Sequence, residues 1–474
     1  MRKRLFIFAA ATCFALSAFA TPAFAEEPNL PDEQTIGSEA SVQSDGNSNG
    51  NSNGNSNGNV KEDALPGGSD DALPDEESYS DEESYSDEER SYSVEGQANS
   101  GAAAPVVAKI GNTEYETLQE AINNANNNDV ITLQDNLTLT EGLRFIGSGD
   151  TADLWKNITV DANGKNLTLN GYGILVSRCN VTFANCPVLT FYAHTAPEDS
   201  HYANLVSPGT LTFDNCSTVT LENDTPDGGG SGLCIYGKGS LYIKNNTNFT
   251  VSGYMSADCS GIYMDCNEQD SNNYAIAMGE IVVSNHSTLT ATKCYHNGIT
   301  ANPVNITVTE SSVIDVSNNN PESGAGKGGL GSYFGKLTVS KGSAVKAHNN
   351  NAKQFAIYVH GFDVDGSSEI EAVDNGILGG GYGIATDGSS ILQSGAKLTA
   401  TGNCGPGVAV CYDYHFYSDP ELVVEDGATI NSYHNYNYGL INDSIFTVKT
   451  GAHVILNENL SGGFDNYPYA TTTV

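Results

Sequence analysis

The sequence has 474 residues, a formal net charge of -37, 51 glycines and only 20 Lys and Arg residues together. The negative charge argues against nucleic acid and anionic lipid as partners, because both carry charge of the same sign. The glycine content and the scarcity of basic residues are typical of a β-rich, turn-rich extracellular protein and not of a helical one.

The N-terminus has the organisation of a secretory signal peptide. Three basic residues at 2–4 precede an apolar run over 5–20, and Ala23-Phe24-Ala25 forms a small-x-small cleavage site. We therefore predict a signal peptide over 1–25 and a secreted or surface-associated mature chain. We expect no transmembrane segment in the mature chain, because no later apolar run is long enough. The polar end over 467–474 carries no wall-sorting signal, so we expect a released protein or a piece of a longer one.

The segment 26–105 is predicted to be a disordered acidic stalk. It contains an Asn-Ser-Asn-Gly repeat over 47–59, two copies of Asp-Ala-Leu-Pro and repeats of the acidic, Tyr-bearing Asp-Glu-Glu-Ser-Tyr-Ser. Such low-complexity sequence has too few aliphatic residues to build a core, and its like charges extend the chain. We interpret the stalk as a passive spacer; the alternative is a Tyr-bearing motif that some partner binds.

A short alternating strand recurs through the rest of the chain. Its copies begin at Val181, Leu211, Leu241, Ile281, Ile306, Leu337, Phe362, Ile391, Leu422 and Phe446, at intervals of 24 to 40 residues. A second strand lies seven or eight residues after each first strand, and a third, which often opens with glycine, precedes it. This pattern predicts a right-handed parallel β-helix over 106–474, with about ten three-strand coils, apolar residues inside and Thr, Ser and Asn outside. The alternative, a β-sandwich, would show hairpin turns every 8–12 residues.

The start of this region has the signature of a capped solenoid end. Thr117-x-x-Glu120 is a capping box, and Leu118, Ala121, Ile122 and Ala125 form one apolar face, which together predict a short helix before a strand over 130–133. The segment 107–139 resembles the entry segment of pectin-lyase-like β-helix proteins, in which a short strand and a helix cap the first coil. The resemblance implies a parallel β-helix over the whole of 106–474.

The same superfamily contains polysaccharide lyases, polygalacturonases and adhesins, so the resemblance alone does not give a function. The polygalacturonase motifs are not reproduced: Asp70-Asp71 lies in the stalk, and His360-Gly361 is not followed by Arg-x-Lys. The lyases use a basic residue beside calcium-binding carboxylates, whereas Arg144 and Arg178 lack a matching acidic cluster. We therefore expect a non-catalytic surface or adhesion protein with no catalytic residues, metal or cofactor. The alternative is a polysaccharide lyase or glycoside hydrolase.

Carboxylates could still pair across stacked coils, as the two carboxyls of a glycosidase do. Asp363, Asp365, Asp374 and Asp387 lie close enough in sequence for such pairing. We interpret all four as solvated turn and surface residues, as most carboxylates are.

Two insertions separate third strands from first strands, at 265–280 and 412–420, and the second is rich in aromatic residues. Aromatic rings on loops of a rigid scaffold are suited to sugar binding, although they could also simply cover the flank of the solenoid. We predict binding to glycans, or to host or cell-surface proteins, through six residues: Tyr412, Tyr414, Phe416, Tyr417, Tyr433 and Tyr436.

Ten cysteines are present, and Cys13 leaves with the signal peptide, so an odd number remains. Cys186 and Cys216 occupy equivalent turns of adjacent coils, with Asn246 next in the row. We predict a Cys186–Cys216 disulfide, with a stack of buried thiols as the alternative.

Overall fold

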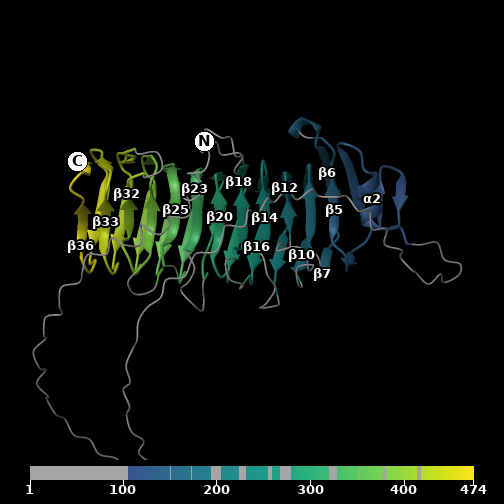
Figure 1. The fold of residues 1–474 in the computed structure, drawn as a ribbon, viewed down its shortest axis with the longest axis horizontal. Coiled ribbons are helices and arrows are strands. Elements are labelled where there is room, and N and C mark those ends of the chain that lie inside the picture. The colour runs from purple at the N-terminus through teal and green to yellow at the C-terminus, as the bar shows by residue number, and fades with distance from the viewer. Residues whose placement is uncertain are drawn as a thin grey trace, which may run out of the picture. The chain divides into compact units, whose positions relative to one another are not determined.

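The computed structural model describes residues 105–149, 151–171, 173–193, 204–223, 231–254, 259–266, 279–319, 328–351, 353–376, 380–413 and 418–474 (Figure 1). The chain divides into two units, Met1–Glu95 and Gly96–Val474, and all described residues belong to the second. The predicted signal peptide and, apart from Pro105, the predicted stalk lie outside the described residues.

The entry segment folds as its local sequence predicts. Strands β1 (Ala108–Ile110) and β2 (Thr113–Tyr115) form an antiparallel hairpin before helix α2 (Leu118–Asn124) and strand β3 (Asp129–Leu133). The Thr117 side chain accepts a hydrogen bond of 3.1 Å from the backbone nitrogen of Glu120, so it satisfies one of the first unpaired donors of the helix. The apolar face of α2 is buried, which confirms the capping helix.

The second strands of successive coils pair in parallel and form one ladder, which we call the second ladder. It has 12 strands: the predicted ten, preceded by β4 and β7. Its strands are β4 (Leu137–Leu139), β7 (Leu167–Gly171), β10 (Val188–Ala193), β13 (Thr218–Glu222), β16 (Asn248–Ser252), β19 (Thr288–Thr292), β22 (Val313–Asp315), β24 (Ala344–His348), β26 (Glu369–Val373), β29 (Lys397–Thr401), β32 (Thr429–Tyr433) and β35 (His453–Asn457).

The first ladder follows the recurrent strand of the sequence. After β3 it contains β6 (Lys156–Asp161), β9 (Cys179–Ala184), β12 (Gly209–Asp214), β15 (Ser240–Lys244), β18 (Gly279–Ser284), β21 (Val304–Val308), β23 (Gly328–Val339), β25 (Phe355–Val364), β28 (Ser390–Leu392), β31 (Glu421–Val424), β34 (Ile445–Val448) and β37 (Thr471–Thr473).

The third ladder consists of the strands that come before the first-ladder strand in each coil. It contains β5 (Leu143–Ile146), β8 (Ile174–Ser177), β11 (Leu205–Val206), β14 (Leu233–Tyr236), β17 (Ile262–Asp265), β20 (Asn297–Asn302), β27 (Tyr382–Thr386), β30 (Val408–Val410), β33 (Tyr438–Asn442) and β36 (Gly462–Asn466). Because β23 and β25 run through both the third and the first ladder, these two ladders form one 25-stranded sheet.

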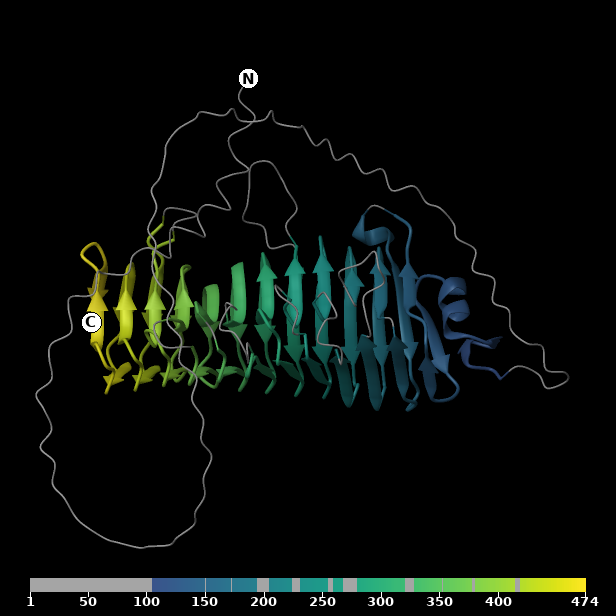
Figure 2. The same ribbon diagram turned by 60° about the horizontal axis from the view of Figure 1, so that its bottom comes forward.

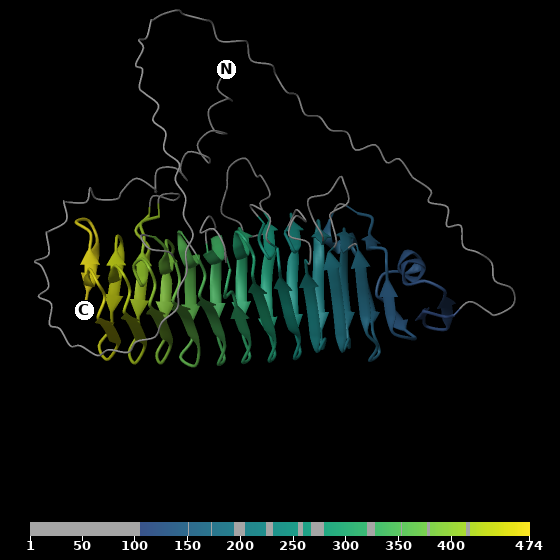
Figure 3. The same ribbon diagram turned by 90° about the horizontal axis from the view of Figure 1, so that it is seen from below.

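Parallel pairing from coil to coil, in three ladders, makes this unit the predicted right-handed parallel β-helix. The turned views show the coils stacked side by side along one axis (Figures 2 and 3). The fold is consistent with the pectin-lyase-like resemblance of 107–139.

Alternate strand residues point inward and are buried. Leu241 and Ile243 of β15 are fully buried between half-buried neighbours. The Phe183 and Phe213 rings of adjacent coils stack with centroids 5.9 Å apart, and Phe249 of the next coil lies 5.0 Å from Phe213. No coil can bury this apolar row alone, so each coil depends on its neighbours for a closed core.

Six asparagines form a ladder in the corner between the second and third ladders. Each side-chain amide nitrogen donates to the Oδ1 of the next residue at 2.9–3.1 Å, and all but the last are buried; the residues are Asn319, Asn350, Asn375, Asn403, Asn435 and Asn459. The expectation that Asn lies outside is therefore wrong at this corner. A tight corner leaves backbone groups unpaired, and these side chains satisfy them inside the solenoid.

The strand repeat predicts that Ile391 aligns with the inward-facing residues that begin the other first strands, and this alignment is wrong by one residue. Ser390 and Leu392 of β28 are buried, whereas Ile391 is only half-buried and pairs with Asp363. The Ser390 hydroxyl accepts a hydrogen bond of 3.1 Å from the Phe362 backbone nitrogen, which fixes a polar residue at this inward position. A one-residue shift exchanges the two faces of a strand, so an inward serine misleads an alignment based on hydrophobicity.

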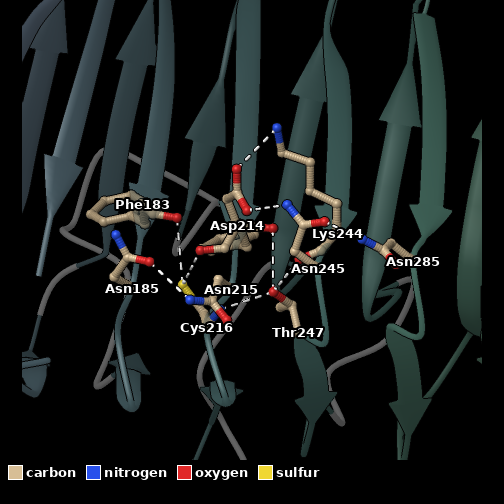
Figure 4. A network of polar contacts seen from close by, with 10 residues as sticks. Phe183, Asn185, Asp214, Asn215, Cys216, Lys244, Asn245, Thr247 and Asn285 are labelled. Atoms are coloured by element: carbon tan, nitrogen blue, oxygen red, sulfur yellow. Dashed lines mark hydrogen bonds and ion pairs between the residues drawn. The ribbon is translucent and has the colours of Figure 1, made fainter. Parts of the chain in front are cut away.

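The turn between the first and second ladders is held by a network of side chains (Figure 4). Asn185, Asn215 and Asn245 have positive φ and donate in turn to the side chains of Asp161, Asn185 and Asp214. Inside this turn, the Cys216 backbone nitrogen donates to Thr247 Oγ1 at 3.0 Å. Asn246 is exposed, so the predicted row Cys186–Cys216–Asn246 continues at Thr247 instead. Two consecutive residues with positive φ, Asn245 and Asn246, change the turn and bring Thr247 inside.

Candidate functional site

The corner between the third and first ladders carries one aligned residue per coil. Tyr236, Asp265 and Asn302 pair directly. Further along the solenoid, the same pairing joins six residues in turn: Ser332, Val359, Thr386, Val410, Asn442 and Asn466. The residues that follow the last five of these therefore also stack, whereas after Ser332 the register shifts and Tyr333 only stands at the same level of its coil. We call the resulting set the corner row: Tyr236, Asp265, Asn302, Tyr333, His360, Asp387, Cys411, Asp443 and Tyr467. Its members are about 4.8 Å apart from coil to coil.

The centre of the corner row is a hydrogen-bonded cluster. The Asp387 side chain is only 10% exposed, and its Oδ1 lies 3.1 Å from Nδ1 of His360, whose side chain is 27% exposed. The Tyr358 hydroxyl donates to the other carboxylate oxygen. The hydrogen bond to Asp387 raises the pKa of His360, although burial opposes this, and Asp413 adds to the increase. A carboxylate at Nδ1 places a proton on that nitrogen and fixes the orientation of the ring.

A β-bulge brings aromatic rings to this cluster. The register of β23 shifts between Ser332 and Lys336, and Phe334 within the shift has φ of 60°. The Phe334 ring lies 6.1 Å from that of His360, and the Tyr333 ring lies 5.2 Å from that of Tyr358. An aromatic residue with positive φ is strained, and bulges often redirect side chains at functional sites. The bulge therefore points to a function at this corner.

The surroundings of the cluster are acidic. Burial raises the pKa of Asp443, and the neighbouring Asp419 raises it further. Burial raises the pKa of the Cys411 thiol to about 12, with Asp387 and Asp443 contributing. His360 is the one basic member of the corner row, and the nearby Lys336 lies 3.6 Å from Asp363. The site thus carries an excess of negative charge.

The predicted binding residues fall into two places. Tyr412 is half-buried beside Cys411 of the corner row, while Tyr414, Phe416 and Tyr417 lie outside the described residues. Tyr433 and Tyr436 are 37% and 52% exposed and lie before β33, at the corner of the asparagine ladder. Tyr433 and Tyr436 precede β33, whereas Tyr412 lies at the corner that follows the third-ladder strands. The five residues of β33 span the distance between these two corners, roughly 15 Å at about 3.3 Å per residue. The structure therefore does not bring Tyr412 together with Tyr433 and Tyr436.

Three of the four candidate carboxylates have local roles. Asp363 contacts Lys336 and accepts a 2.7 Å hydrogen bond from Gln393. Burial would raise the pKa of Asp365, but hydrogen bonds from the Lys341 backbone and from two serines lower it overall. Asp374 has positive φ in a turn.

Asp387 differs from these three, and its interpretation as a solvated surface residue is wrong. It is buried in contact with His360 and Tyr358. Sequence reasoning also missed the importance of His360. The signal was present, because His360 precedes Asp387 by 27 residues, which is one coil.

The structure records no sulfur–sulfur bond among the nine cysteines of its described part. The Cys186 thiol donates to the Lys165 and Val188 carbonyls. The Cys216 thiol donates to the Phe183 and Asp214 carbonyls (Figure 4). Burial raises the pKa of Cys186 to about 11 and that of Cys216 to about 12. Strand pairs on both sides place the two cysteines at the same level of adjacent coils. Their disulfide stays a prediction.

Within the described ranges, no group of three or more His, Cys, Asp or Glu side chains is arranged to hold a metal ion. None of the described helices is long and apolar enough to span a bilayer.

No family model matches the sequence, and no curated protein matches it. Among solved structures, a double mutant of the periplasmic alginate epimerase AlgG is similar, with 12% identity over 73% of this chain and 84% of that chain, at a TM-score of 0.28. A single mutant of the same epimerase matches at 11% identity over 73% and 83%, also at 0.28. A TibC-catalyzed hyper-glycosylated TibA fragment matches at 13% identity over 72% and 98%, at 0.19. At such low identities and TM-scores these matches carry no conclusion about function, and the chain is described by its own fold: a right-handed parallel β-helix.

Proposed function

We propose that this chain is an exported, extracellular or surface-associated β-helix protein that binds a glycan along the corner row. The observation that carries the proposal is the arrangement of aromatic rings beside a buried, hydrogen-bonded carboxylate: Tyr333 and Tyr358 next to Asp387. Binding sites for small polar ligands combine such apolar walls with a few fixed polar groups. Sugars offer both an apolar ring face and hydroxyl groups to such a surface.

In this proposal, Tyr412, Tyr414, Phe416 and Tyr417 belong to the binding surface of the corner row. Tyr412 follows Cys411 directly, so the insertion begins at the row itself. Tyr433 and Tyr436 form a separate exposed patch that could bind a cell-surface protein.

The experiment is retention of the full-length chain on an array of plant, host and microbial polysaccharides. Tyr412→Ala is the test variant, and Tyr433→Ala, at the other corner, is its matched control. We expect retention on at least one glycan, an increase in Kd of about tenfold for Tyr412→Ala, equal to ~1.4 kcal/mol, and little change for Tyr433→Ala. The proposal fails if no polysaccharide of the array retains the protein, or if the control variant loses more affinity than Tyr412→Ala.

A polysaccharide-modifying enzyme is a second candidate, and the His360–Asp387 contact favours it. A buried carboxylate that orients an imidazole is the arrangement of a general base, and Tyr358 lies beside it as a candidate proton donor. The same array, scored for new reducing or unsaturated ends, tests this function. Products that disappear in His360→Gln but persist in Asp363→Ala would establish an enzyme; retention without products would exclude these reactions on the glycans of the array.

A further inference from the structure

We infer that the ligand of the corner row is a glycan that bears ammonium groups, an amino-sugar polymer, and not a polyuronate. This inference rests on the proposed glycan binding and names the chemical class of the ligand.

The first argument is the charge of the row. Its ionisable members include Asp265, Asp387 and Asp443, against a single basic residue, His360, which is already in contact with Asp387. A polyuronate would add one carboxylate per sugar to this environment, and like charges brought together at an interface cost several kcal/mol. A chain of ammonium groups would find carboxylates along the direction in which the coils stack.

The second argument is the electrostatic state of Asp443. Burial and the carboxylate of Asp419 raise the pKa of Asp443, because both disfavour the ionised form. An ammonium group at this place would reverse the effect of Asp419 and stabilise the ionised form. A cationic ligand would therefore relieve the repulsion that Asp419 exerts on an ionised Asp443, and an anionic ligand would increase it.

The third argument is the position of the rings. Tyr467, 43% exposed, occupies the row one coil beyond Asp443, and burial together with the carboxylates of Asp465 and Asp443 raises its pKa. Tyrosine faces attract cations and also pack against the C–H groups of a sugar ring. Rings and carboxylates within one short stretch thus match the two parts of an amino sugar.

The built part of the site lies at Asp387. Its side chain is nine-tenths buried, and contacts with His360 and Tyr358 hold it in place. The carboxylate is therefore fixed before any ligand arrives, which lowers the entropic cost of binding.

The experiment is calorimetric titration of the full-length chain with three hexasaccharides. They are the hexamers of glucosamine, of N-acetylglucosamine and of galacturonate, and the last is tested with and without calcium. The acetylated hexamer is the matched ligand, because it differs from the first only in the acetylation that removes its charges. We expect Kd for the glucosamine hexamer to be at least about tenfold lower than for either of the others, and to rise with salt.

Variants locate the site. Asp443→Asn is close in shape to the native residue, and the exposed Asp419→Asn provides a second test that does not depend on a buried position. Each should raise Kd for the glucosamine hexamer at least about fivefold, roughly 1 kcal/mol. Glu222→Gln, exposed on the second ladder, removes the same charge elsewhere and should leave Kd unchanged.

Four outcomes overturn the inference. Equal binding of the acetylated hexamer, or tighter binding of galacturonate in either calcium condition, contradicts the ligand class while glycan binding stands. Equal weakening by Glu222→Gln and Asp443→Asn shows general charge attraction instead of a site. If neither these hexamers nor any polysaccharide of the array binds, the proposed function itself fails, and the inference with it.

Discussion

Nδ1 of His360 lies 3.1 Å from Oδ1 of Asp387, across one coil boundary. Since this contact raises the pKa of His360, the folded state binds a proton more tightly than the unfolded state does. The resulting stability is fully present below the unfolded pKa of about 6.5 and is lost as the pH rises through the higher folded pKa. We expect the difference in urea midpoint between the native chain and His360→Gln to shrink over that window. An NMR titration that places the pKa of His360 at or below its ordinary value would contradict this.

Asn403 is a fully buried member of the asparagine ladder whose side chain donates and accepts hydrogen bonds. Its side chain donates to Ala372 and Asn435 and accepts from Asn375, with no exposed surface. Asn403→Ala leaves several buried groups unpaired, at about 1–3 kcal/mol each, so we expect a loss of at least about 3 kcal/mol in the free energy of unfolding. Urea denaturation measures it. Asn457→Ala, exposed at the end of β35, is the control and should change stability by less than about 0.5 kcal/mol.

Gly388 allows the close approach of two coils beside the cluster. A Cβ atom at this position would lie 1.3 Å from the His360 carbonyl oxygen, a distance that forces the backbone to move. We expect Gly388→Ala to destabilise the protein by about 1–3 kcal/mol and to weaken the His360–Asp387 contact, seen as a fall in the pKa of His360. Ser389→Ala, at the exposed neighbouring position, should do neither.

The Cys186–Cys216 disulfide is testable by mass spectrometry on protein secreted into an oxidising medium. Adjacent coils are about 4.8 Å apart, which falls within the Cα separation of disulfides, roughly 4.4–6.8 Å. We expect denatured protein to resist alkylation at these two residues until a reductant is added. Alkylation of both without reductant would leave the buried thiol stack as the arrangement. Cys294, fully buried two coils further on, should be alkylated in either case.

The parts of the fold that depend on local sequence could be predicted. The Thr117–Glu120 cap is contained in four consecutive residues, and the strand repeat survives variable loop lengths because each first and second strand keep a nearly fixed separation. The asparagine ladder could not be predicted in the same way. An asparagine in a sequence indicates a turn, and nothing local distinguishes Asn403, which faces inward, from Asn246, which faces solvent.

The candidate site was missed for a related reason. His360 and Asp387 are partners only through the stacking of two coils, and the interval between coils varies with the insertions. The aligned pairs that reveal the corner row are therefore visible only once each strand has a definite neighbour. The error at Ile391 is the same problem within a strand, because a buried serine removed the hydrophobic marker of the inward face.

The asparagine ladder also has a consequence for how such a chain can change over time. Asn375 and Asn403 occupy the same place one coil apart, 28 residues from each other, and each makes the same contacts with its neighbours. Loss or duplication of one complete coil would place an equivalent asparagine beside each remaining one, so the ladder would stay continuous. The gene for this protein can therefore lengthen or shorten by whole coils. A deletion of half that length would break the ladder and the core together.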